Sequence, residues 1–189
     1  MGTVRDVDFD KLVFIDETGS NAAMAPLYGR GFKGDRVRGR RPRNDTRRTL
    51  TVIGALTAQG LEAVMTITGG TSTVVFLAFV QEVLAKVLVP GQVVIMDNLA
   101  AHKAEVIRRA IEACGAAVWF LPPYSPQFNP IELCWNKLKH LLRAANARCR
   151  DSLDRAIAAA MDAITPHDAV AWFRHCGYGR RVAHWSCAP

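Results

Sequence analysis

The sequence lacks the features that mark membrane, secreted and disordered proteins. Its longest apolar run, Val74 to Val80, is far shorter than the roughly 20 residues that cross a bilayer. The first residues, MGTVRD, contain neither the apolar core of a signal peptide nor the Ser or Thr of an N-myristoylation signal. No internal repeat or low-complexity tract is present. These absences predict a soluble, untargeted, cytoplasmic protein with no membrane partner.

Cysteine is present but lacks the spacing of a structural site. The five cysteines are an odd number with wide gaps and no C-x-x-C pair, so neither a zinc site nor a disulfide framework is indicated. They are Cys114, Cys134, Cys149, Cys176 and Cys187. A reducing compartment fits this pattern best.

Acidic residues are outnumbered, since 24 Lys and Arg face 17 Asp and Glu and give a net charge of +7. This excess makes a polyanion the first partner to consider. Nine of the cations fall within a Gly-containing segment, residues 28–48, which we call the basic loop. They are Arg30, Lys33, Arg36, Arg38, Arg40, Arg41, Arg43, Arg47 and Arg48.

The chain of 189 residues has the length of one domain, and half of its residues are apolar. Apolar and β-branched runs predict strands over residues 11–16, 49–57, 61–68, 93–96 and 117–121. Helices are predicted from Thr71 or Ser72 to about 87, and over about 103–114, 130–145, 152–164 and 166–176. Strand, helix, strand order with short connections implies parallel pairing of the later strands. We therefore predict an α/β domain with a mixed five-stranded sheet, three antiparallel strands first and two parallel strands after.

Three acids fall at the ends of these elements. Asp16 ends the first predicted strand, Asp97 follows the fourth, and Glu132 lies in the first turn of a helix. Acids beyond the carboxyl ends of adjacent parallel strands would lie close together and repel unless a cation holds them. Oxygen ligands without His or Cys suit Mg²⁺ or Mn²⁺. Each strand acid also has a structural interpretation, as a solvated strand end or an Asx turn, and Glu17 is an alternative to Asp16.

Glu132 has the strongest structural alternative. Asn129 is a good N-cap, Pro130 suits the first helical position, and Glu132 is then the reciprocal residue of a capping box. The helix pairs an apolar stripe with a second stripe at i, i+4, i+7 and i+11. The second stripe is Glu132, Asn136, Lys139 and Arg143. It fits either a solvated face or a track for phosphates leading to a metal site.

Several motifs together carry a family resemblance. FIDET, then IMDNLAAHK, then FLPPYSPQFNPIELCWNKLK and a closing HCGY resemble the DDE transposases of the mariner superfamily, specifically the bacterial insertion-sequence six-thirty family. The likeness spans about residues 11–178, and 34 residues separate Asp97 from Glu132, the spacing typical of this branch. It implies an RNase H-like catalytic core in which Asp16, Asp97 and Glu132 are the catalytic, metal-binding acids. Asn98, His102 and Asn129 would support them.

The resemblance further implies DNA transposition with Mg²⁺ or Mn²⁺, two ions being expected. Double-stranded DNA would be bound by the basic loop together with Lys139 and Arg143, in a dimer or larger assembly. We expect one catalytic domain over 1–189, with a short tail from about 179. Family members carry helix-turn-helix segments before the first aspartate, whereas only ten residues precede the first predicted strand here, so we expect that domain to be absent. That predicts either a split element with a separate helix-turn-helix polypeptide or a degenerate copy.

Two alternatives stay open on the sequence alone. One is an RNase H-like nuclease that hydrolyses DNA without joining it. The other is a non-catalytic DNA-binding remnant.

Overall fold

One mixed sheet organises the chain. The structure is a computed structural model that describes residues 7–21, 24–25, 28–36, 49–99 and 102–179. The strands are β1 (Leu12–Ser20), β2 (Leu50–Thr57), β3 (Gly60–Thr68), β4 (Val93–Met96) and β5 (Ala117–Phe120). They lie in the order β3-β2-β1-β4-β5, with β1, β2 and β3 antiparallel and β1, β4 and β5 parallel. The predicted mixed five-stranded sheet is confirmed.

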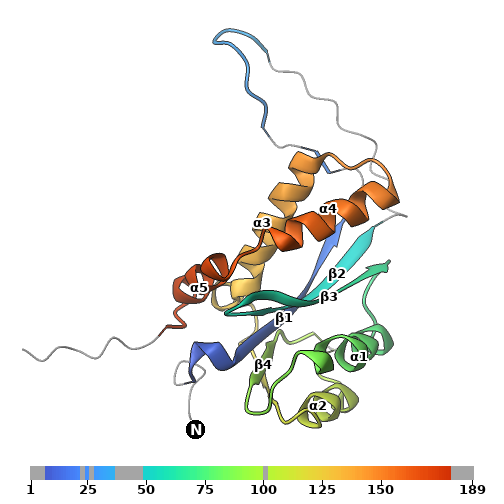
Figure 1. Ribbon diagram of the computed structural model, residues 1–189, viewed down its shortest axis with the longest axis vertical. Coiled ribbons are helices and arrows are strands. Elements are labelled where there is room, and N and C mark those ends of the chain that lie inside the picture. Colours follow the sequence, from blue (N-terminus) through green and yellow to red (C-terminus); the bar gives the residue numbers. More distant parts are fainter. Residues whose placement is uncertain (1–6, 22–23, 26–27, 37–48, 100–101, 180–189) are drawn as a thin grey trace, which may run out of the picture.

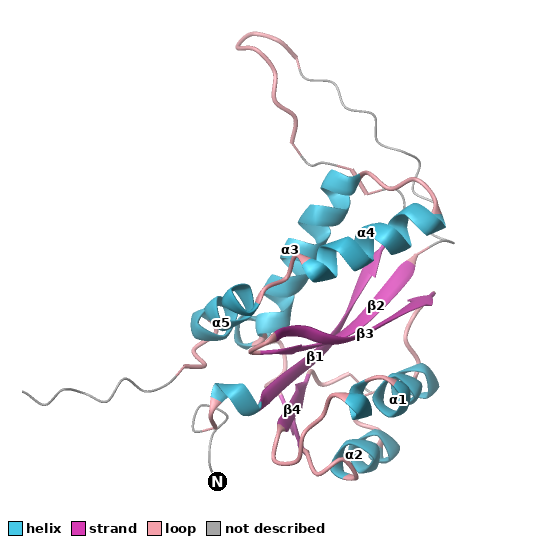
Figure 2. Cartoon of the chain, viewed as in Figure 1, coloured by secondary structure: helices cyan, strands magenta, loops and turns pink. Residues whose placement is uncertain are grey.

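Helices cover both faces of this sheet (Figures 1 and 2). The α-helices are α1 (Thr73–Glu82), α2 (Glu105–Glu112), α3 (Pro130–Ala145), α4 (Arg150–Asp162) and α5 (Pro166–His175). Short 3₁₀ helices are η2 (Phe9–Lys11), η4 (Leu84–Lys86) and η5 (Pro126–Phe128). Helices α3, α4 and α5 pack on one face, and α1 and α2 on the other.

Successive side chains along β1 point to opposite faces of the sheet. Leu12 and Phe14 are buried in the core under α3 to α5, whereas Val13 and Ile15 are buried in the core over α1 and α2. Because successive strand residues point to opposite faces, Asp16 continues the first set and Glu17 the second. The two neighbouring acids therefore meet different partners.

Most predicted elements are present, with three informative differences. The first predicted strand was too short, because β1 continues past Asp16 to Ser20 by pairing with β2. The helix expected to reach about residue 87 ends at Glu82 and is followed by η4. The proline-rich segment, residues 121–129, contains η5, although its prolines favour extended backbone.

The cysteines and the lengths of the helices were also considered in the sequence. Cys114, Cys134, Cys149 and Cys176 are free in the described part of the chain. None of the helices described is long and apolar enough to cross a membrane.

Candidate active site

Asp16 and Asp97 meet at the point where parallel pairing stops. The last parallel pair of β1 and β4 is Phe14 with Ile95. Asp16 lies two residues further along β1, and Asp97 directly follows β4. The prediction that Asp16 ends its strand is therefore wrong. Asp16 does lie beyond the last residue of β1 that pairs with β4. Adjacent parallel strands open a crevice at this position.

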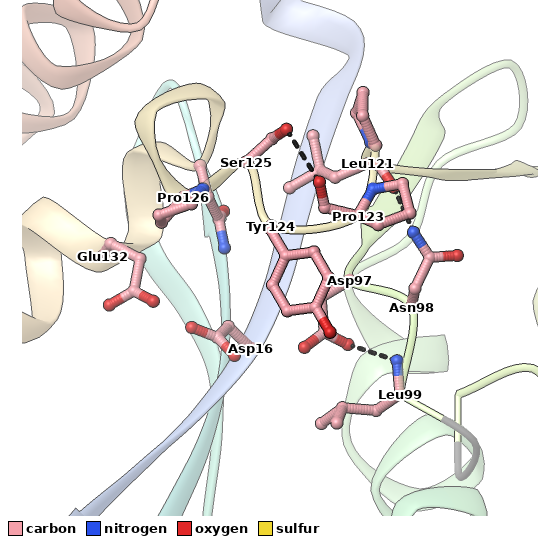
Figure 3. Close-up of a pocket in the computed structure, with 12 residues that line it drawn as sticks. Asp16, Asp97, Asn98, Leu99, Leu121, Pro123, Tyr124, Ser125, Pro126 and Glu132 are labelled. Carbon is pink, nitrogen blue, oxygen red and sulfur yellow. Dashed lines mark hydrogen bonds between the residues drawn. The ribbon is translucent and has the colours of Figure 1, made fainter.

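Glu132 reaches the same crevice from α3. Asn129 and Pro130 start this helix at the predicted residues, and Glu132 occupies its first turn. Figure 3 shows the carboxylates of Glu132 and Asp16 pointing toward each other, with Asp97 nearby. All three acids line one cavity of about 420 Å³. Three elements far apart in the sequence thus converge on one site.

The predicted capping box at this helix is wrong. Asn129 has the N-cap position, but its side chain makes no capping hydrogen bond. Instead the side chain lines the cavity, and its Oδ1 is buried without a partner among the described residues. The Glu132 side chain is exposed and makes no hydrogen bond within the described part of the chain. The start of α3 therefore leaves both side chains available to a ligand.

Asp16 lies in an environment that resists its ionisation. It is 9% exposed. Burial, and then the charges of Glu132, Glu17 and Asp97, raise the pKa of Asp16 to about 7, although a hydrogen bond from the Glu17 backbone opposes the shift. The indole Nε1 of Trp135 donates a hydrogen bond to Asp16 Oδ2 at 3.2 Å. No cationic side chain in the described part of the chain offsets the charge of Asp16.

Asp97 is held by a different set of contacts. Its Oδ1 accepts a hydrogen bond from the Leu99 backbone at 3.0 Å and lies 2.7 Å from His102 Nδ1. Burial raises the pKa of Asp97, but the hydrogen bonds with His102 and Leu99 outweigh it and the pKa is lowered. Asp97 is therefore ionised more readily than Asp16, so the two carboxylates differ in charge state near neutral pH.

His102 links the two strands beneath the site. Its Nε2 lies 3.0 Å from Glu17 Oε1, while Nδ1 contacts Asp97. The ring packs against Phe76 of α1 with centroids 4.3 Å apart. Burial lowers the pKa of His102, but the hydrogen bonds and charges of Asp97 and Glu17 raise it to about 9. A protonated His102 donates to both acids, so it ties Asp97 to β1 through Glu17.

The loops around the cavity are tied together as well. Asn98 Nδ2 donates a short hydrogen bond to the Leu121 carbonyl, joining the segments that follow β4 and β5. Tyr124 lies at the cavity with its side chain fully exposed and φ of 55°. Figure 3 shows Ser125 bonded to the Pro123 carbonyl, a contact of 3.2 Å. The proline-rich segment thus forms one wall of the site.

The predicted DNA-contacting residues are only partly described. Arg30, Lys33 and Arg36 are exposed on the described part of the basic loop, residues 28–36, which projects beyond the end of the molecule formed by α3 and α4 (Figure 1). Lys139 and Arg143 lie about two and three turns along α3 from Glu132 and are half-buried. The other predicted cations lie outside the described residues. They are Arg38, Arg40, Arg41, Arg43, Arg47 and Arg48.

The donor set fits a hard divalent cation, although no three candidate ligands of the described residues already form a metal cluster. Asp16, Asp97 and Glu132 offer carboxylate oxygens to one cavity. The charges of Glu132, Glu17 and Asp97 repel an ionised Asp16, and no cationic side chain among the described residues bonds to Asp16 itself. A bound cation would relieve that repulsion, so these residues fit Mg²⁺ or Mn²⁺.

Three parts of this arrangement were not found from the sequence. Glu17 was only an alternative to Asp16, and Trp135 was one unnamed member of the apolar stripe on the helix of Glu132. Gly54 did not appear at all, although it lies opposite Asp16 on β2. The partners are far apart in the chain, since Trp135 lies 119 positions after Asp16 and His102 lies 85 positions after Glu17. No local spacing signals such pairs.

Known structures share this fold. The Mos1 strand transfer complex matches with a TM-score of 0.66 at 14% identity, over 89% of this chain and 51% of the Mos1 chain. The Mos1 mariner paired end complex with Mg matches at 0.62 and 16%, over 88% and 53%. The catalytic domain of Mos1 mariner transposase matches at 0.60 and 13%, over 89% and 76%. The predicted RNase H-like fold is confirmed, and the chain spans about half the length of the Mos1 chains in the DNA complexes.

Sequence comparison defines the family. None of the curated proteins compared matches the chain. Residues 11–154, about three quarters of the sequence, match the family described as DDE superfamily endonuclease, and this stretch contains all three acids. The chain therefore belongs to the DDE superfamily endonucleases.

Proposed function

We propose that this chain is the catalytic domain of an insertion-sequence transposase, which cleaves and joins DNA strands by metal-assisted phosphoryl transfer. The observation that carries the proposal is the convergence of Asp16, Asp97 and Glu132, from three separate elements, on one cavity. Membership of the DDE superfamily endonucleases supports a nuclease reaction. The structural likeness to Mos1 complexes with Mg and with Mn supports use of either ion.

The three acids share one role in this proposal, and the residues around them have others. Asp16, Asp97 and Glu132 would hold Mg²⁺ or Mn²⁺, and the expected number of ions is two. When bound, the cations supply activation of the attacking oxygen and stabilisation of the leaving oxygen. His102 would hold Asp97 in place, and Glu17 would hold His102. Asn129 would offer its side-chain amide to the substrate from the cavity wall.

Both steps of the reaction are substitutions at phosphorus. In cleavage, a water oxygen bonds to phosphorus, the bond from phosphorus to the 3′ oxygen breaks, and the strand end is released as a 3′-hydroxyl. In joining, that hydroxyl attacks a phosphodiester of the target DNA and displaces another 3′ oxygen. The chain's residues provide positioning and charge, which carry most of the catalysis in phosphoryl transfer.

DNA would be held without base reading. The cations of the basic loop, with Lys139 and Arg143, would contact backbone phosphates, so binding should weaken steeply as salt rises. Joining two transposon ends requires two active sites, so we propose a dimer or larger assembly on DNA. A separate helix-turn-helix polypeptide would supply recognition of the ends. Such a protein would act in the bacterial cytoplasm, at the nucleoid.

The test is a nicking and strand-transfer assay on DNA that carries the element's ends, with Mg²⁺, with Mn²⁺ and with chelator. Metal-dependent cutting followed by joining is the expected result. Cutting without joining would indicate the RNase H-like nuclease instead. Binding without cutting would indicate a non-catalytic remnant.

A further inference from the structure

The Trp135 indole fills the space above Gly54, the β2 residue opposite Asp16. Asp16 pairs with Gly54 across the antiparallel β1 and β2 strands. A Cβ atom at Gly54 would lie 2.6 Å from Trp135 Cη2, 3.0 Å from Leu61 Cδ1 and 3.3 Å from Trp135 Cζ2, so the indole makes the tightest contact. Real Cβ atoms do not approach that closely, so the ring takes the space that glycine leaves. The ring position thus depends on residue 54 having no side chain.

From its position above Gly54 the indole hydrogen-bonds to the carboxylate of Asp16. Trp135 is 1% exposed, and its Nε1 donates to Asp16 Oδ2 at 3.2 Å. A buried indole N–H needs an acceptor, and Asp16 provides it. Trp135 is also the only side chain in the described part of the chain that donates a hydrogen bond to Asp16. The indole N–H and the Glu17 backbone N–H are therefore the donors that orient this carboxylate, and Trp135 is the one contributed by a side chain.

The same ring sets the distance between two acids. Trp135 lies three residues after Glu132 on α3 and packs α3 against the sheet next to Asp16. Residues three apart on a helix are neighbours on its surface. The contact of Trp135 with Gly54 and Asp16 therefore positions the first turn of α3, and with it Glu132, relative to β1.

We propose that Trp135, seated on Gly54, is a positioning residue that orients Asp16 for a divalent cation and fixes its separation from Glu132. The inference rests on the proposed metal-assisted cleavage. An uncharged donor suits this role, because it orients a carboxylate without offsetting the negative charge that attracts the cation. A Lys or Arg in its place would compete with the metal for Asp16. Hydrogen bonds to ligating carboxylates are worth about 10–100-fold in metal affinity or activity.

The main test compares Trp135→Phe with the wild-type protein. Phenylalanine keeps an aromatic ring but lacks the N–H donor and the atoms nearest Gly54. We expect Mn²⁺ affinity, measured directly by calorimetry without DNA, to fall by about 10–100-fold. The metal concentration for half-maximal cleavage should rise by a similar factor, with little change in DNA affinity. A purely structural role would lower the thermal midpoint and leave metal affinity unchanged.

A second variant tests the seat itself. Gly54→Ala should weaken Mn²⁺ binding in the wild-type background, because the new methyl group displaces the ring. In the Trp135→Phe background the same change should have a smaller effect, since the indole atoms are gone and only Leu61 Cδ1, 3.0 Å from the new Cβ, remains close. Gly19→Ala is the matched control in a neighbouring strand, because its Cβ would meet nothing closer than 3.8 Å. Equal effects of Gly54→Ala in both backgrounds would overturn the proposed seat.

If Trp135→Phe does not fold, NMR can test the inference with Trp135 intact. The Trp135 indole N–H resonance in an ¹⁵N-correlated NMR spectrum should move in Asp16→Asn and on addition of Mg²⁺ to the wild type. An unmoved resonance contradicts the inference. If the wild type binds metal and Trp135→Phe binds it equally well, only this inference fails. If the wild type binds no metal and cuts no DNA, the proposed function fails, and the inference with it.

Discussion

Asp16 should make the metal-free protein progressively less stable as pH rises. Its pKa is raised from 3.8 to about 7 in the folded protein. Between these values the folded state binds more protons than the unfolded state, so the free energy of unfolding falls with increasing pH. The Asp16→Asn variant removes this titration and can still accept the Trp135 hydrogen bond. Comparison of the two proteins therefore isolates the contribution of Asp16.

The size of the effect follows from the two pKa values. At about 1.36 kcal/mol per pKa unit, the destabilisation by Asp16 is roughly 1.5 kcal/mol at pH 5 and roughly 4 kcal/mol at pH 8. We therefore expect the stability of Asp16→Asn, relative to the wild type, to increase by about 2.5 kcal/mol between these pH values. Mg²⁺ should reverse the order at pH 8, because it binds the ionised wild-type carboxylate and stabilises that folded state.

The assay is urea unfolding in chelator at several pH values from 5 to 8, repeated with Mg²⁺. A stability difference that stays constant with pH, or that shrinks as pH rises, would refute the raised pKa of Asp16. A wild type that gains no stability from Mg²⁺ at pH 8 would show that relief of charge repulsion by a cation is not part of the site.

Two other substitutions test the surroundings of the acids. His102→Asn should lower the free energy of unfolding most below pH 6.5, and the loss should shrink as pH rises through about 9. The reason is that the stabilisation by a histidine with a raised pKa disappears over that range. A loss independent of pH in chemical unfolding contradicts a charged His102 between Asp97 and Glu17. Asn129→Ala should change the free energy of unfolding by less than about 1 kcal/mol, because no capping bond is lost, whereas Thr165→Ala, whose hydroxyl accepts from the Asp168 N–H at the start of α5, should lower it by about 1 kcal/mol. The opposite order in thermal or urea unfolding contradicts the assignment of the Asn129 side chain to the cavity.

Local signals predicted the elements that local chemistry defines. The Asn129-Pro130 start and apolar stripe of α3 predicted its bounds, and the apolar run before Asp97 predicted β4. Both depend on residues close together in sequence. Prediction of β1 stopped at Asp16 because an acid usually ends a buried run, whereas pairing with β2 carries the strand to Ser20. That pairing is a tertiary effect.

The site was predicted in outline for the same reason. The acids could be located because each comes directly after a recognisable local signal: an apolar run before Asp16 and before Asp97, and the Asn-Pro helix start before Glu132. Their environment could not, since the carboxylate of Asp16 depends on Trp135 and Gly54, and that of Asp97 on His102 and Glu17. The capping box at Glu132 was wrong although its residue types fit, because the Asn129 side chain lines the cavity instead. Residue type alone does not distinguish these two uses.

The most direct measurement is Mg²⁺-dependent DNA cleavage by Glu132→Gln, with its thermal midpoint recorded in parallel. Glutamine keeps the shape of the side chain but is neutral and a poor ligand for Mg²⁺. Because the Glu132 side chain makes no hydrogen bond within the described part of the chain, the midpoint should stay within about 2–4 °C of the wild type. The metal-site account predicts a folded variant that no longer cuts DNA. A folded Glu132→Gln variant that cuts at the wild-type rate would contradict it.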